Sequence, residues 1–143
     1  MSERRRVGQH ELWREPETGF LYLVNEGMMN EEEAAGVLEA MRALTTDLAP
    51  NDPVFFIADN RKATGFTSGA RKVLANGSGN RGESRIAIFG VAFVYGAALK
   101  LLLKTISVVA RNAMTVNIVA NEAEARTWLL EQQRIMRERR PSA

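Results

Sequence analysis

Few residues of this 143-residue chain have the types and the spacing that enzyme chemistry requires. There is no cysteine, which excludes disulfides, thiol nucleophiles and thiolate metal sites. His10 is the single histidine, so a histidine-based metal site is excluded as well. A Ser/His/Asp triad built on His10 stays open in principle, but no GxSxG nucleophile elbow supports it. We therefore expect no catalytic residue, no metal and no cofactor, and we expect that the protein is not an enzyme.

One glycine-rich segment, Gly77-Ser-Gly79-Asn-Arg-Gly82, has the GxGxxG pattern of dinucleotide-binding loops. That pattern needs a strand before it and a helix after it, so that the helix N-terminus meets the pyrophosphate. Here the glycines follow a predicted helix, which Gly77 is placed to end, and they precede a predicted strand. The pattern therefore indicates a loop, with weak anion binding by Arg81 and Arg85 as the alternative.

Asp59 is the carboxylate in the most suggestive place. It directly follows Val54–Ala58, a run that is apolar on both faces and so predicts a buried strand. Ligands of open α/β sheets gather beyond the carboxyl ends of such strands. No partner acid or base accompanies Asp59, so the alternatives are a functional residue and a plain cap of the loop that we expect over Asn60–Phe66.

Thr67, Ser68 and Gly69 have the composition of a helix start. Serine or threonine at an N-cap accepts a hydrogen bond from the first turn, which is the structural interpretation. The functional alternative is phosphorylation. A phosphate at a helix N-terminus is favoured by the helix dipole and adds about two negative charges to the surface.

Hydrophobic spacing and capping residues divide the chain into strands and helices in the order ββαβαβαβα. Two of the helices begin with an Asn-x-x-Glu capping box, at Asn30 and at Asn121. The expected elements are a hairpin of His10–Arg14 and Phe20–Val24, a helix from Asn30, a strand Val54–Ala58, a helix from Thr67 to Gly77, a strand Ile86–Gly90, a helix Val91–Val109, a strand Thr115–Val119 and a helix from Asn121.

Strand–helix–strand repeats joined by crossovers predict a mostly parallel sheet. We expect an α/β fold in which a sheet of about five strands, with an N-terminal β-hairpin, is covered by four helices. Residues 10–136 form this single domain, and the arginine-rich residues 1–9 and 137–143 are expected to be basic tails. No apolar stretch of a signal peptide follows the first arginines, so we expect a cytoplasmic protein. The net charge is +2 and no basic face interleaved with aromatics is visible, so we expect no nucleic-acid partner.

The stretch Arg85–Arg111 is more apolar than a helix on one sheet face needs. Its uncharged run, Ile86–Leu99, is shorter than the roughly 20 residues that span a bilayer. We expect the helix Val91–Val109 to be covered by a second copy of the chain, as a homodimer. Two alternatives stay open, a site for an apolar ligand and peripheral contact with a membrane surface. The side chains expected to line the ligand site or the interface are Phe66, Phe93, Tyr95, Leu99 and Leu103.

The element order, Asp59 after its strand and the Phe66-Thr67-Ser68-Gly69 start of the next helix resemble the STAS domain, the fold of bacterial anti-sigma-factor antagonists. In that family an Asp-Ser-Ser-Gly-type motif opens the corresponding helix, and a partner kinase phosphorylates a serine in it. Ser68 matches that serine and Gly69 the glycine after it, while Phe66 replaces the aspartate and Thr67 the first serine. The resemblance implies phosphorylation at Ser68, or at Thr67 beside it, with Asp59 and Gly69 in the switch loop.

The pattern over about residues 10–135, which ends in the helix Asn-Glu-Ala-Glu-Ala-x-x-Trp-Leu, is similar to the SpoIIAA-like branch of this family, which is often compared with SEC14-type apolar-ligand binders. This likeness implies a non-enzymatic regulatory module that binds another protein or itself. The alternative that it leaves open is a carrier or sensor of a lipid or another apolar small molecule.

Overall fold

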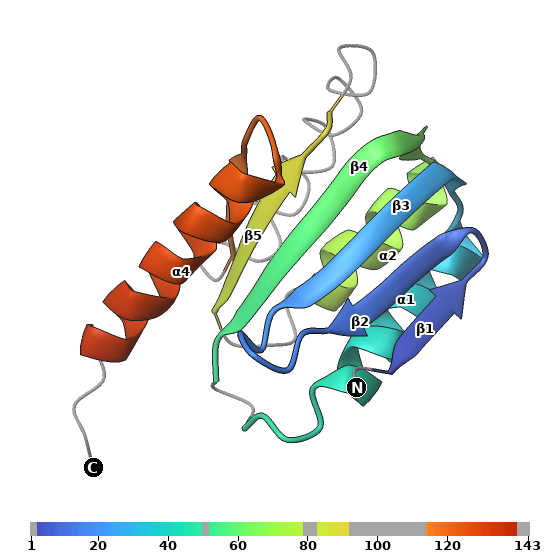
Figure 1. Cartoon of the computed structure of the whole chain (residues 1–143). Coiled ribbons are helices and arrows are strands. Elements are labelled where there is room, and N and C mark those ends of the chain that lie inside the picture. The colour runs from blue at the N-terminus through green and yellow to red at the C-terminus, as the bar shows by residue number, and fades with distance from the viewer. Residues whose placement is uncertain (1–2, 50–51, 79–82, 92–113, 140–143) are drawn as a thin grey trace.

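The computed structural model describes residues 3–49, 52–78, 83–91 and 114–139 (Figure 1). These ranges contain six strands and three helices. The strands are β1 (Arg4–Val7), β2 (His10–Arg14), β3 (Leu21–Met29), β4 (Val54–Phe66), β5 (Ser84–Phe89) and β6 (Met114–Ile118). The helices are α1 (Glu31–Leu44), α2 (Ser68–Ser78) and α4 (Glu122–Arg139).

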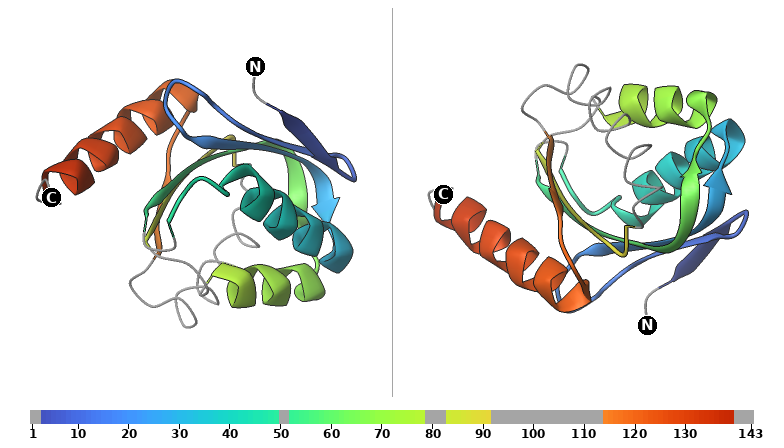
Figure 2. Two further views of the ribbon diagram at one scale, coloured as in Figure 1. Left: turned by 90° about the horizontal axis from the view of Figure 1, so that it is seen from below. Right: turned by 90° about the horizontal axis from the view of Figure 1, so that it is seen from above.

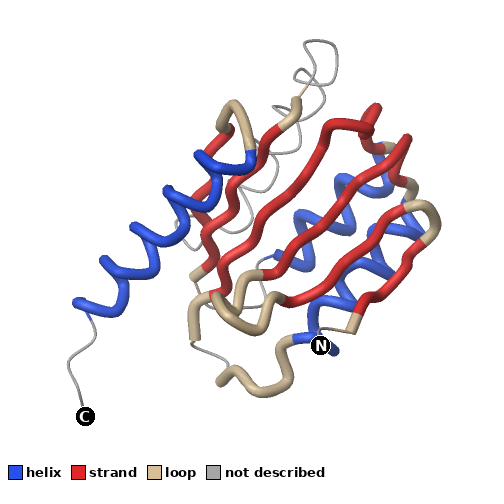
Figure 3. The backbone as a smooth tube through the Cα atoms, in the orientation of Figure 1, coloured by secondary structure: helices blue, strands red, loops and turns tan. Residues whose placement is uncertain are grey.

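The strands form one mixed sheet in which the order in space equals the order along the chain, β1-β2-β3-β4-β5-β6 (Figure 3). β1, β2 and β3 are antiparallel neighbours, and β3 to β6 run parallel. α1 and α2 cover one face of the sheet, and α4 lies on the opposite face (Figure 2). The predicted α/β class and the N-terminal hairpin are therefore confirmed, with six strands in place of about five.

The core consists of two apolar clusters, one on each face of the sheet, because successive side chains of a strand point to opposite faces. On β4, Phe56 and Ala58 join the cluster under α1 and α2, while Phe55 and Ile57 join the cluster under α4. The run from Val54 to Asn60 is buried throughout, as expected for a parallel strand with helices on both faces. The sequence signal of an apolar run without a polar face was thus interpreted correctly.

Capping residues fix where two of the helices begin. Asn30 accepts a hydrogen bond from the N–H of Glu33 at 2.8 Å, and Glu33 accepts one from the N–H of Asn30 at 2.9 Å. This reciprocal capping box at α1 confirms the prediction. At α4, Asn121 accepts from the N–H of Glu124 at 2.9 Å, so the second predicted cap is also present.

The predicted N-terminal tail is wrong for residues 4–7, because Arg4–Val7 form the edge strand β1. β1 pairs with β2 through a two-residue turn that includes Gly8, whose φ of 59° favours glycine. Val7 packs closely on α1, since a Cβ at Gly36 would lie 2.7 Å from its Cγ1. The predicted C-terminal tail is wrong at its start, because α4 continues to Arg139, whose guanidinium lies 3.2 Å from the carboxylate of Glu83.

The loop predicted over Asn60–Phe66 is also wrong, because β4 continues to Phe66. These residues pair in parallel with the second half of β3 across two register shifts. Gly27 lies at the second shift with a φ of 72°, a backbone conformation that favours glycine and lets the strand bulge. Asp59 therefore lies inside a strand and not at its end.

Gly77 does not end α2, which continues to Ser78. Instead α2 passes close to α1 at this glycine, since a Cβ there would lie 2.3 Å from Cδ1 of Leu38. The predicted helix Val91–Val109 lies almost entirely outside the described residues. In the part of the chain that the structure describes, no helix is long and apolar enough to cross a membrane.

Candidate functional site

The chain passes from β4 into α2 beside the point where β3 passes into α1. The N–H of Thr67 donates to the carbonyl oxygen of Met29 at 2.9 Å, so a hydrogen bond joins the β4–α2 connection to the β3–α1 connection. The N–H of Ala70 donates to Oγ1 of Thr67 at 3.1 Å, so Thr67 is the N-cap of α2. The guanidinium of Arg71 donates to the carbonyl oxygen of Phe66 at 3.1 Å. The N-termini of α1 and α2 therefore lie together at the carboxyl ends of β3 and β4.

Ser68 is exposed as the first residue of α2. Because Thr67 accepts the capping bond, the Ser68 side chain has no capping role. Its hydroxyl makes no hydrogen bond to the residues that the structure describes. The next residue, Gly69, lies against α1, since a Cβ there would be 3.0 Å from Cβ and from Oε2 of Glu31. An acidic side chain therefore borders this exposed serine.

Asp59 lies in the middle of β4 and is held by Arg61, two residues further on. The Arg61 guanidinium donates from Nε to Oδ1 at 3.0 Å and from Nη2 to Oδ2 at 2.8 Å, and its backbone N–H donates to Oδ1 at 3.1 Å. Burial acts to raise the pKa of the Asp59 carboxyl, but the hydrogen bonds and the charge of Arg61 outweigh it and lower that pKa. Asp59 is two residues after Ile57 and so points to the same face, the one that carries α4, whereas Ser68 opens α2 on the other face. The structure does not bring these two predicted site residues together.

The face that carries α4 has a polar and aromatic network that the sequence analysis missed. The hydroxyl of Tyr22 donates to Oε1 of Glu122 at 2.7 Å, and Arg126 donates to Glu122 at 2.9 Å and to Glu15 at 2.6 and 2.8 Å. Burial and the Glu122 carboxylate raise the pKa of the Tyr22 phenol. Trp13 stacks on Tyr22 with ring centroids 4.6 Å apart. The only sequence signal was alternation along the hairpin, which places both rings on one face.

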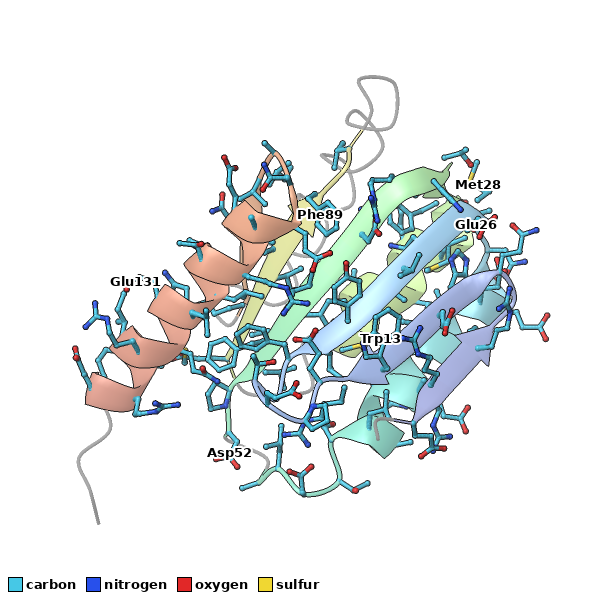
Figure 4. The ribbon with its side chains drawn as sticks, in the orientation of Figure 1. Trp13, Glu26, Met28, Asp52, Phe89 and Glu131 are labelled. Atoms are coloured by element: carbon cyan, nitrogen blue, oxygen red, sulfur yellow. The ribbon has the colours of Figure 1, made fainter. Side chains whose placement is uncertain are left out.

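Trp13 lies on the part of this face that α4 does not reach (Figure 4). The guanidinium of Arg4, on the edge strand, lies 4.2 Å from the centre of the Trp13 ring and donates to Oε1 of Glu11 at 3.0 Å. Phe89 lies at the other end of the face, close to α4, with the guanidinium of Arg61 5.5 Å from the centre of its ring. Arginine side chains thus cover aromatic rings at both ends of this face.

His10 is buried between the hairpin and α1, with 1% of its surface exposed. Its Nδ1 accepts the N–H of Glu26 at 3.2 Å, and its Nε2 lies 3.6 Å from Oε2 of Glu33. Burial is the main cause that lowers the pKa of the His10 imidazole, although the Glu33 carboxylate acts to raise it. Both ring nitrogens of His10 therefore face groups of the fold.

Of the predicted ligand or interface residues, Phe66 is buried in the cluster under α1 and α2. The other four, Phe93, Tyr95, Leu99 and Leu103, lie outside the described residues, so the apolar-ligand site and the homodimer through Val91–Val109 stay predictions. Within the described ranges, no group of histidine, aspartate and glutamate side chains is placed to hold a metal ion.

A search of solved structures matched the chain to the crystal structure of an uncharacterized protein of the DUF3478 family from Shewanella loihica PV-4, which is described as having a SpoIIAA-like fold. The match covers 90% of this chain and 92% of that protein, with a TM-score of 0.56 and 13% sequence identity. This chain has a SpoIIAA-like fold.

A scan against models of protein families and a search of curated proteins found no match. The fold predicted from the resemblance is thus confirmed by the structural match. In the SpoIIAA-like fold of this chain, Thr67, Ser68 and Gly69 open α2 at the carboxyl end of β4. Asp59 is separated from them by the second half of that strand.

Proposed function

We propose that this protein is a non-enzymatic module that acts by binding another protein, and that the binding is switched by phosphorylation of Ser68. The observation that carries the proposal is that Ser68 is exposed at the start of α2 while its neighbour Thr67 caps the helix. A serine that is not needed as a cap can be modified without removing a bond that holds the helix start. Thr67 is the less suitable acceptor, because its hydroxyl oxygen already accepts the N–H of Ala70.

A phosphate on Ser68 would change the charge of this surface by about two units. The N-terminus of α2 favours that negative charge through its dipole and its free N–H groups. Glu31 on the neighbouring helix repels it, and the exposed Lys72 lies one turn further along α2. A partner that fits the neutral surface at the two helix N-termini would meet a dianion there, which costs affinity through repulsion and desolvation.

The side chains with acid or base chemistry support a role without catalysis. Asp59 is ion-paired and hydrogen-bonded to Arg61, and His10 is buried against Glu33. Neither residue lies at the start of α2, where the exposed hydroxyl of Ser68 is found. A binding role needs only the exposed surface at these helix N-termini.

The first experiment is to purify the full chain from its own cells with phosphatase inhibitors and to map phosphate by mass spectrometry. Cleavage after Lys62 and Arg71 releases a peptide that holds Thr64, Thr67 and Ser68, and fragmentation within it assigns the site. We expect phosphate on Ser68. Phosphate confined to Thr64, or none under any growth condition, contradicts the switch.

The second experiment uses Ser68→Asp and Ser68→Ala as tagged baits in co-purification. If wild type and Ser68→Ala retain a partner, we expect Ser68→Asp to retain at least roughly tenfold less of it. Thr67→Ala is the matched control for structure, since loss of the cap should lower the free energy of unfolding by about 1 kcal/mol while Ser68→Ala leaves it unchanged. Equal retention by both Ser68 variants would contradict the proposed switch.

A further inference from the structure

The strand β1 is one of the two edge strands of the sheet, at the end opposite to β6. A two-residue turn connects β1 to β2, and the register of the pair places Val7 opposite His10 and Arg5 opposite Leu12. In such a hairpin the hydrogen-bonded pairs alternate with non-hydrogen-bonded pairs. Val7 and Arg5 therefore use their backbone groups toward β2, and those of Arg4 and Arg6 point away from the sheet. Two N–H and two C=O groups are thus available to another strand.

This edge is held firmly, although it lies close to the start of the chain. Gly36 on α1 lets Val7 approach so closely that an added Cβ would be 2.7 Å from its Cγ1. Gly8 in the turn lies against Glu33, where an added Cβ would be 2.0 Å from Oε2. The strand is short and carries three arginines, which disfavour pairing with a like-charged strand, but it has no proline and no bulge that would prevent pairing with an acidic one. The edge is therefore presented in the conformation that a pairing strand needs.

A hollow of about 800 Å³ lies beside this edge, between β1 and α1. On the β1 side it is lined by Arg5, Arg6, Val7 and Gly8. On the α1 side it is lined by small residues and by three glutamates, of which Glu32 and Glu39 have no ion pair among the described residues. Side chains of a strand that pairs with β1 would point alternately into this hollow and toward the opposite face of the sheet. The alanines and the glycine of α1 leave space in the hollow for apolar side chains at these positions.

The opposite face of the same edge is positively charged. Arg4 and Arg6 alternate with Arg5 and so point to the face that carries Trp13. Arg6 is exposed and has no ion pair among the described residues. A second copy of the chain would place arginines opposite arginines, which is unfavourable. Acidic side chains on an incoming strand would instead pair with Arg4 and Arg6.

We propose that the free edge of β1 binds an extended segment of another protein in which acidic residues alternate with small apolar residues. The segment adds a strand to the sheet through the backbone groups of Arg4 and Arg6. Its acidic side chains lie beside these two arginines, and its small side chains enter the hollow next to α1. This inference rests on the proposed protein-binding function and assigns it a contact surface distinct from Ser68.

The probe is an acetylated and amidated seven-residue peptide that alternates glutamate with alanine and valine. It is titrated into the ¹⁵N-labelled full chain at low salt. We expect the amide exchange of Arg4 and Arg6 to slow roughly tenfold or more when the peptide binds, while the amides of Arg5 and Val7 change little. A peptide of the same composition with its glutamates grouped together, and one with lysine in place of glutamate, should bind at least about fivefold more weakly.

The matched variants are Arg6→Pro and Arg6→Thr. Both remove the charge, but only proline removes the outward N–H, and an edge strand tolerates proline at such a position. Arg6→Pro should therefore bind the peptide about fivefold more weakly than Arg6→Thr. Protected amides of Arg5 and Val7 show that β1 stays paired in the proline variant. If that strand is lost, Arg4→Pro against Arg4→Thr gives the same comparison.

Three results would overturn the inference. The first is peptide binding without protection of Arg4 and Arg6, and the second is no binding at all. The third is protection of these amides without peptide that increases with protein concentration, because a second copy of the chain then occupies the edge. Ser68→Asp should bind this peptide like wild type. Failure at β1 therefore leaves the proposed switch standing, and failure of the Ser68 experiments leaves the peptide result standing.

Discussion

The two faces of the sheet are held by different means. The face under α1 and α2 carries the larger apolar cluster, and its helices approach neighbouring elements closely at Gly36 and Gly77. The face under α4 carries a smaller cluster and adds the network of Tyr22, Glu122, Arg126 and Glu15. Polar groups therefore take part in attaching α4.

The polar groups on the two faces also differ in how they are satisfied. On the α4 face the network is only partly buried, and each of its members has a hydrogen-bond partner. On the α1 face, His10 and Asn25 are buried, and Nε2 of His10 and Oδ1 of Asn25 have no hydrogen-bond partner. Near water, polar side chains can attach an element at little cost, whereas a buried histidine has to remain neutral. The two faces should therefore respond differently to mutation and to pH.

The largest expected effect is at the apolar contact of α4. Leu129 is fully buried, and its neighbour Leu130 is 49% exposed on the same helix, so the pair offers one substitution in two environments. We expect Leu129→Ala to lower the free energy of unfolding by about 3 kcal/mol and Leu130→Ala to change it by less than about 0.5 kcal/mol. Urea denaturation measures both. Similar values for the two variants would show that the Leu129 side chain does not hold α4 on the sheet.

The second expected effect concerns the polar attachment of the same helix. Tyr22→Phe keeps the ring that stacks on Trp13 and removes only the hydroxyl that donates to Glu122. We expect a loss of about 1 kcal/mol, because Glu122 is partly exposed and is also bonded to Arg126. A double-mutant cycle with Glu122→Ala, which removes the accepting carboxylate, isolates the coupling. A coupling energy of zero would mean that this hydrogen bond does not contribute to attaching α4.

The smallest expected effect is a pH response of the α1 face. The pKa of His10 is lowered from its ordinary value of 6.5, mainly by burial, so the unfolded chain binds the proton more readily than the folded chain. His10 therefore lowers the stability of the fold as the pH falls below 6.5 toward the folded pKa. Replacing His10 with glutamine should remove this slope. Denaturation midpoints measured between pH 7.5 and pH 5 test this prediction. An unchanged slope in the variant would show that another group causes the loss of stability.

The α4 face should respond in a different pH range. The pKa of Glu15 lies below its ordinary value of 4.5, chiefly because Arg126 donates hydrogen bonds to it, and the pKa of Glu122 is lowered by the hydrogen bonds from Tyr22 and Arg126. The stability that these carboxylates contribute is complete above pH 4.5 and is lost as the pH falls through their folded pKa values. The comparison therefore predicts that the α1 face loses stability below pH 6.5 and the α4 face only below pH 4.5.

Much of the fold was visible in the sequence because it depends on local signals. Apolar runs and alternation gave the central strands, and the Asn-x-x-Glu pattern gave the starts of α1 and α4. The second half of β4 gave no such signal, since Asn60, Arg61 and Lys62 look like a loop. Those residues are extended because β3 pairs beside them, which is a contact between distant parts of the chain.

The same distinction applies to the candidate site and to the edge strand. The helix start at Thr67 and Ser68 was predicted, but only the structure shows which of the two hydroxyls accepts the capping bond. The arginines before Val7 have the composition of a solvated tail. They form a strand because they pair with β2, and Val7 packs against Gly36 on α1. No pattern in the sequence indicates either contact.

Because the order of the strands in space equals their order along the chain, each described strand pairs with the strand that precedes it in the sequence. No described strand has to be inserted between two others that are already paired. During synthesis β1, β2 and β3 are made before β4, β5 and β6, which can then be added in turn at one growing edge. The opposite edge, formed by β1, is complete before the second half of the chain has been made.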